Sequence, residues 1–134
     1  MIFRICLLLS AVACYTSMAL VYVERHRVGS RVRLYLRPRE EYWVRERFGV
    51  AWEFIKHCGP YERGPHCHTF VTKDYKPSQP RTFAAVHADG ALVIDPMQAT
   101  DIGIYYCGTP NVTYMTGQSA AFNQPPYIGL LLKP

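Results

Sequence analysis

One stretch near the C-terminus, residues 91–108, constrains the fold of this chain more than any other. It begins with alternating apolar residues, Leu92 and Ile94, and breaks at Pro96. A polar corner then leads into the run 101–107, which ends in a cysteine. Alternation with a period of two is typical of a β-strand with one buried face. The stretch therefore predicts two strands joined by a short corner.

Four residues at alternate positions of the second strand form the pattern D-x-G-x-Y-x-C: Asp101, Gly103, Tyr105 and Cys107. The pattern resembles the E–F region of immunoglobulin domains, where the hydroxyl of this tyrosine bonds to upstream backbone. The alternative is a buried strand that ends in a cysteine by chance, which requires four residue types to coincide. The resemblance implies an all-β fold, an immunoglobulin-like two-sheet antiparallel Greek-key sandwich.

Length and composition agree with one small β domain. A chain of 134 residues fits a single domain. Hydrophobic residues make up 49% of the chain and charged residues 19%, which is a globular composition. The 10 Tyr, 10 Pro and 9 Gly favour a chain rich in strands and turns.

Residues 1–19 have the pattern of a secretory signal peptide. Arg4 supplies a positive charge, an apolar core follows at residues 5–13, and small residues precede a cleavage point after Ala19. Cleavage there leaves residues 20–134 as a single secreted, extracellular immunoglobulin-like domain. No internal repeat is visible in it.

Two alternatives to this N-terminus have to be weighed. Cleavage after Ala13 would keep Cys14 in the mature chain. A transmembrane anchor would need about 20 apolar residues, and Thr16 and Ser17 interrupt the run early. We expect no membrane span, because no second apolar stretch of that length exists.

Period-two alternation and turn residues predict the remaining strands. The two strands predicted for residues 91–108 correspond to strands E and F of the fold. Strands A, B, C, C′, D and G are expected at residues 20–25, 31–36, 49–55, 69–72, 81–87 and 127–133. Asp89 and Gly90 predict a type I′ hairpin turn before strand E, because both central positions of that turn need positive φ. The polar stretch 37–48 is expected to be a connection between strands B and C.

The resemblance also implies roles for individual core positions. We place the core tryptophan at Trp52, because its flanks alternate while Trp43 lies among charges. The first core cysteine of the family is expected at Leu36, so the usual disulfide between strands B and F is absent. Arg81 lies where the family places a basic residue opposite Asp101. If partly exposed, that ion pair contributes about 1 kcal/mol or less.

Three cysteines remain after cleavage at Ala19, and any single pairing among them leaves one thiol. If Cys107 lies beside Trp52, then Cys58 lies six residues further along strand C. That is about 20 Å away, beyond the reach of a disulfide. We therefore expect Cys58 to pair with Cys67 and Cys107 to be a buried thiol against Leu36. Pairing of Cys107 with a retained Cys14, or between chains, stays open.

The same region contains a mixed set of cysteines and histidines: His57, Cys58, His66, Cys67 and His68. Thiolate and imidazole groups together can bind zinc. However, the spacing matches no standard zinc pattern, and an oxidising compartment favours the disulfide. We expect no metal and no other cofactor. No catalytic motif such as G-x-S-x-G or H-E-x-x-H is present, so we do not expect an enzyme.

The chain is similar to small secreted single-domain immunoglobulin proteins of invertebrates, which act in adhesion, synaptic organisation or immune recognition. This resemblance implies binding to an extracellular or cell-surface protein. Tyr61 and Arg63, in the loop between the paired cysteines, are the candidate contacts, because Tyr and Arg are favoured anchors at interfaces. Asn111 begins an N-glycosylation acceptor, Asn-Val-Thr.

Charge supports an alternative partner. Without Arg4 the chain carries a net charge of +4, and residues 20–63 hold ten basic and six acidic residues. Arginine-rich surfaces attract sulfated glycans and anionic surfaces. The alternative function is therefore a binder of heparan sulfate or another anionic surface through residues 25–47. No nucleic-acid partner is expected.

Overall fold

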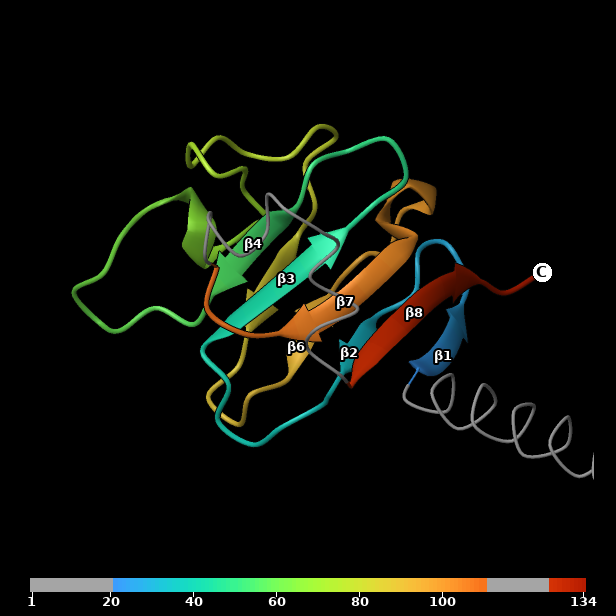
Figure 1. The fold of residues 1–134 in the computed structure, drawn as a ribbon, viewed down its shortest axis with the longest axis horizontal. Coiled ribbons are helices and arrows are strands. Elements are labelled where there is room, and N and C mark those ends of the chain that lie inside the picture. The colour runs from blue at the N-terminus through green and yellow to red at the C-terminus, as the bar shows by residue number, and fades with distance from the viewer. Residues whose placement is uncertain (1–20, 111–125) are drawn as a thin grey trace, which may run out of the picture.

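The computed structural model describes residues 21–110 and 126–134, which form two β-sheets (Figure 1). Within these residues, no helix is long and apolar enough to span a membrane. The expected signal peptide and Asn111 lie outside the described residues. The strands are β1 (Val21–His26), β2 (Val32–Leu34), β3 (Tyr42–Glu46), β4 (Glu53–Lys56), β5 (Ala84–Val86), β6 (Leu92–Ile94), β7 (Gly103–Cys107) and β8 (Tyr127–Leu132). Two single-turn 3₁₀ helices are η1 (Pro65–Cys67) and η2 (Ala99–Asp101).

The strand order confirms the predicted immunoglobulin-like sandwich. One sheet has five strands in the order β1-β8-β7-β3-β4, and the other has three in the order β2-β6-β5. Neighbouring strands are antiparallel except β1 and β8, which are parallel. In the nomenclature of the fold these sheets are A′GFCC′ and BED, so β4 joins the G–F–C sheet as in variable-type domains.

Strand β7 contributes two residues to the centre of the core, in agreement with the prediction from residues 91–108. Tyr105 and Cys107 both lie between the sheets, 0% and 2% exposed. The hydroxyl of Tyr105 donates to the carbonyl of Asp101 at 2.5 Å, which is the predicted tyrosine corner. A Cβ on Gly103 would lie 2.6 Å from the carbonyl oxygen of Glu46, so glycine is required for β3 and β7 to approach. Leu36 packs against the cluster that contains Cys107.

The prediction that Trp52 is the core tryptophan is wrong. Trp43 is fully buried between the sheets, lies opposite Cys107 on β7, and donates from Nε1 to the carbonyl of Gly90 at 2.9 Å. Strand C is therefore β3, within the stretch expected to be a polar connection. Trp52 immediately precedes β4 in the sequence. Its half-buried side chain packs on the outer face of the five-stranded sheet.

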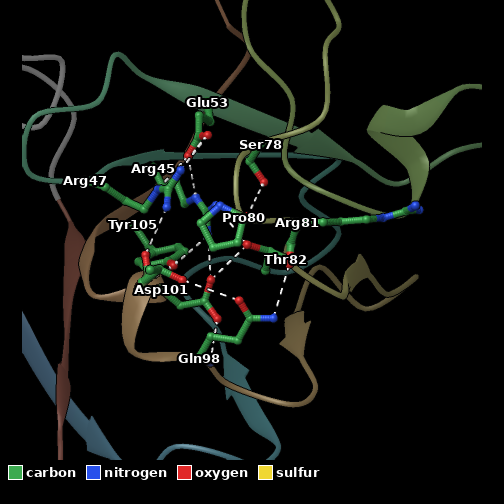
Figure 2. Close-up of polar contacts among 11 residues, drawn as sticks. Arg45, Arg47, Glu53, Ser78, Pro80, Arg81, Thr82, Gln98, Asp101 and Tyr105 are labelled. Carbon is green, nitrogen blue, oxygen red and sulfur yellow. Dashed lines mark hydrogen bonds and ion pairs between the residues drawn. The ribbon is translucent and has the colours of Figure 1, made fainter.

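One of the charged residues beside Trp43 is itself a core residue, so neighbouring charges do not mark this stretch as a surface connection. Arg45 is fully buried on the same face of β3 as Trp43. Its Nε donates to Glu53 at 2.8 Å, and its Nη1 donates to Asp101 at 3.1 Å (Figure 2). Arg47 adds two bonds of 2.9 Å to the carboxylate of Glu53. Two arginines and two carboxylates thus form a charge-balanced network.

The expected ion pair between Arg81 and Asp101 is absent. Arg81 is exposed, its guanidinium lies over the ring of Phe83, and its side chain points away from the network (Figure 2). Asp101 instead accepts from Arg45 and, at 2.8 Å, from the hydroxyl of Thr82. Thr82, and not Arg81, therefore faces the E–F corner. The arginine that pairs with Asp101 is Arg45 of strand C.

Other boundaries also differ from the predictions. The strand expected at residues 49–55 as strand C begins later, as β4 at Glu53–Lys56. It is strand C′ and pairs antiparallel with β3. The C′ strand expected at 69–72 forms only an isolated bridge between Phe54 and Val71. The β5–β6 hairpin is present, but of its turn residues only Gly90 has positive φ, so the turn is not type I′.

Candidate interaction site

The predicted disulfide between Cys58 and Cys67 is present, with Cα atoms 5.5 Å apart. It closes a loop, drawn in green in Figure 1, that projects beyond β4 at the edge of the sheet farthest from β1. Gly64 has a φ of 152°, which favours glycine, and leads into η1. The predicted pairing is confirmed, but the reasoning behind it placed Cys58 at the end of strand C. In the structure Cys58 follows strand C′.

The loop presents Tyr61 and Arg63 to solvent. Tyr61 is 96% exposed, and Arg63 is also exposed. Glu62, between them, points back and accepts from Lys56 at 2.6 and 2.7 Å. Glu62 also bonds to Nε2 of His66 at 3.3 Å. The hydrogen bond from Lys56, with a smaller contribution from His66, lowers the pKa of Glu62. The loop is therefore held at its base by a covalent bond and an ion pair.

A cluster of aromatic rings lies beside this loop on the outer face of β3 and β4. We call it the aromatic cluster: Tyr42, Trp52, Phe54, His66 and Tyr75. Tyr75 is 56% exposed and meets Phe54 and His66 edge to face, with ring centroids 5.3 and 5.2 Å away. Phe54 is at the centre, with Tyr42 and Trp52 at 6.4 and 6.2 Å. Phe54 and His66 are buried, 3% and 9% exposed, so the surface of the cluster is formed by the exposed Tyr75 and the half-buried Tyr42 and Trp52.

The aromatic cluster is not predicted by the sequence pattern described above. The available indication was the period-two spacing of Trp52, Phe54 and Lys56, which places all three on one face of the strand. The same spacing equally fits a strand with Trp52 in the core, which is the expectation that the structure overturns. Tyr75 could not be found in this way, because it reaches Phe54 from a loop outside the two sheets.

The metal-ligand set suggested by the sequence is only partly brought together. Among residues 21–110 and 126–134, Cys58, His66 and Cys67 lie close enough to share a metal, but the disulfide occupies both sulfurs. His57 instead uses its Nδ1 to bond the carbonyl of Val86 at 2.8 Å. His68 is exposed and lies outside the group.

Among the described residues, the thiol of Cys107 is free and buried. Burial, together with the carboxylate of Glu40, raises its pKa to about 12. Because the thiolate is the nucleophilic form, this cysteine is chemically inert at neutral pH. It therefore offers no candidate for nucleophilic catalysis in the folded protein.

The arginine-rich half is less basic at the surface than its sequence indicates. Arg45 and Arg47 are buried with Glu53 and do not contribute to a surface charge. Two of the others form ion pairs, the exposed Arg33 with Asp89 and Arg37 with the half-buried Glu40. The expectation that residues 25–47 form one basic surface is therefore wrong at Arg45 and Arg47.

No protein-family model matches this sequence, and no curated protein matches it significantly. Solved structures of similar shape include the extracellular fragment of novel immune-type receptor 10 from Ictalurus punctatus. The TM-score is 0.46 at 15% identity, over 85% of this chain and 97% of that one. Two marsupial T cell receptor chains have TM-scores of 0.38 and 0.36 at 14% and 15% identity, over 83% and 85% of this chain. The matches cover 48% and 49% of those receptor chains.

Proposed function

We propose that this protein is a secreted, non-catalytic recognition domain that binds an extracellular or cell-surface protein. Binding takes place through the loop closed by Cys58 and Cys67 and through the adjacent aromatic cluster. The observation that carries the proposal is the 96% exposure of Tyr61 on a loop that is covalently closed. Tyrosine and arginine are enriched among the residues that carry most of the binding energy at protein interfaces.

Rigidity is the physical reason why this surface suits binding. A flexible loop loses conformational freedom when it binds, and that loss weakens affinity. Here the disulfide and the bonds from Lys56 to Glu62 hold the loop before any partner arrives. Tyr61 and Arg63 can then act as anchors, and the half-buried rings beside them supply apolar contact area.

The test is binding of the purified secreted protein, multimerised on a fluorescent carrier, to a panel of cells from expressing tissue. We expect the double variant Tyr61→Ala with Arg63→Ala to lose at least about 30-fold in apparent affinity, because one interface anchor alone contributes about 2 kcal/mol or more. Each variant would first be checked by circular dichroism. Retained binding in a folded double variant would contradict the proposal.

Tyr22→Ala is the matched control. Tyr22 is 56% exposed on β1, at the opposite edge of the same sheet, so its removal should leave binding unchanged. A second arm, with cells treated with heparan-sulfate lyase, tests the alternative glycan function. Loss of binding there, with strong dependence on salt, would favour charge-driven attachment through the exposed arginines.

A further inference from the structure

The base of the disulfide loop brings two sulfurs and an imidazole together. The sulfurs of Cys58 and Cys67 and a ring nitrogen of His66 all lie within 4.8 Å of one another. In a tetrahedral zinc site with bonds of about 2.3 Å to sulfur and about 2.0 Å to nitrogen, ligand atoms lie about 3.4–3.8 Å apart. Small side-chain rotations would therefore bring these three groups to zinc-binding distances once the sulfurs are no longer bonded to each other.

His66 already has the arrangement expected of a metal ligand. It is 9% exposed, and its Nε2 is bonded to the carboxylate of Glu62 at 3.3 Å. Its Nδ1 is buried and has no hydrogen-bond partner among the described residues. A buried polar atom without a partner costs about 1–3 kcal/mol. In metal sites a carboxylate commonly orients the imidazole by bonding the ring nitrogen that does not bind the metal.

The backbone around the imidazole also fits this reading. A Cβ on Gly64 would lie 2.7 Å from both Cε1 and Nδ1 of His66, so only glycine allows the ring to occupy this place. Bonds independent of the disulfide keep the loop folded. They include Lys56 to Glu62 and, within η1, the N–H of Cys67 to the carbonyl of Gly64 at 3.2 Å.

We propose that reduction of the Cys58–Cys67 disulfide converts this loop into a zinc site. Its ligands are Cys58, His66 and Cys67, with Glu62 orienting the imidazole and a water in the fourth position. The reductant is a dithiol, which transfers two electrons and two protons. The S–S bond breaks, two cysteine thiols form, and the dithiol becomes a disulfide. Zn²⁺ then binds both thiolates, and two protons are released to solvent.

The experiment compares zinc binding by the oxidised and reduced protein. The protein is reduced with a phosphine, desalted without oxygen or chelator, and titrated with Zn²⁺ against a chromophoric chelator. We expect one zinc per reduced chain and none per oxidised chain. Co²⁺ in place of zinc should give the thiolate charge-transfer and tetrahedral d–d absorption bands.

Two histidines flanking Cys67 provide a matched pair of variants. His66→Gln should weaken zinc binding more than 100-fold, while His68→Gln, which changes an exposed neighbour, should leave it unchanged. Glu62→Gln should weaken zinc binding about 10- to 100-fold by releasing the imidazole. Cys107→Ala should have no effect.

Three results would overturn the proposal. The first is that the reduced protein binds no zinc, whether it stays folded or not. The second is equal loss in His66→Gln and His68→Gln, which would indicate binding by a disordered chain. The third is zinc binding that His66→Gln leaves unchanged. Circular dichroism of the reduced protein, with and without zinc, accompanies each titration.

Discussion

The guanidinium of Arg45 lies between the two sheets, 4.1 Å from the centre of the Phe70 ring. It donates to Glu53, Asp101 and, at 2.9 Å, to Thr82. A planar group with five donors can satisfy several acceptors in fixed directions, which an ammonium group cannot. At the residue scale, Arg45 therefore links strand C, strand C′ and the E–F corner, two residues along β3 from Trp43, which lies opposite Cys107.

Arg45→Ala should lower the free energy of unfolding by about 3–5 kcal/mol, because it leaves two buried carboxylates with one remaining arginine. Urea unfolding followed by fluorescence measures the loss. Arg31→Ala, at an exposed position, is the control and should change stability by less than about 0.5 kcal/mol. A loss below about 1 kcal/mol in Arg45→Ala would show that the network is not a stabilising link.

Tyr105 makes the network sensitive to alkaline pH. Its burial raises its pKa to about 12 from an ordinary value near 10. The folded protein therefore keeps this proton where the unfolded chain releases it, so stability is complete below pH 10 and falls between about pH 10 and 12. Tyr105→Phe should be less stable at pH 7 by about 1–2 kcal/mol but should show a smaller loss over that range. Equal slopes in unfolding titrations of the two proteins would contradict this assignment.

Cys107 gives a prediction about reactivity. Its burial and its pKa of about 12 should prevent alkylation of the native protein at neutral pH. In denaturant without reductant, one alkyl group should be added per chain, and mass spectrometry would locate it at Cys107. If no group is added in denaturant, Cys107 is paired with Cys14 or with another chain.

At the scale of strands, the sequence was most informative where alternation and a rare motif coincide. The D-x-G-x-Y-x-C pattern located β7 and the tyrosine corner, since its residues are set by contacts within that corner. Strand C could not be located in the same way. Its inward positions carry Trp43 and Arg45, and a hydropathy pattern does not detect an arginine whose charge is matched by carboxylates from two other segments.

The two tryptophans test the position of strand C. Trp43→Phe should cost about 2–3 kcal/mol, because the substitution leaves a cavity and removes the bond to Gly90. Trp52→Phe should cost less than about 1 kcal/mol. Acrylamide should quench the fluorescence of the Trp43→Phe protein, which retains Trp52, more strongly than that of the Trp52→Phe protein. The reverse order would restore Trp52 as the core residue.

The sequence predicted the disulfide loop of the candidate site but not the aromatic cluster, because only the loop has a local sequence signal. Tyr61, Arg63 and the disulfide were found because Gly-Pro pairs and cysteines mark a closed loop in the sequence itself. The aromatic cluster depends on Tyr75 reaching Phe54 across 21 positions of the chain. A local pattern carries no information about such a contact.

For the whole molecule, the disulfide lies at one edge and does not join the sheets. Replacing Cys58 and Cys67 together by serine should lower stability by about 2–3 kcal/mol, the chain-entropy cost of opening a short loop. The two-sheet fold should persist, and near-ultraviolet circular dichroism of the core aromatics should be unchanged. Global unfolding of this variant would mean that the loop is required for folding.

The parallel pairing of β1 and β8 has a mechanical consequence. Six residue pairs join these strands, from Val21 with Tyr127 to His26 with Leu132. A force applied at Val21 and Leu132 therefore pulls along the ladder and loads its hydrogen bonds together. Once these hydrogen bonds break, the disulfide prevents extension only of the segment between Cys58 and Cys67, a sequence separation of 9. The domain would resist stretching first and then yield nearly its whole length, whereas a disulfide between the sheets would stop extension early.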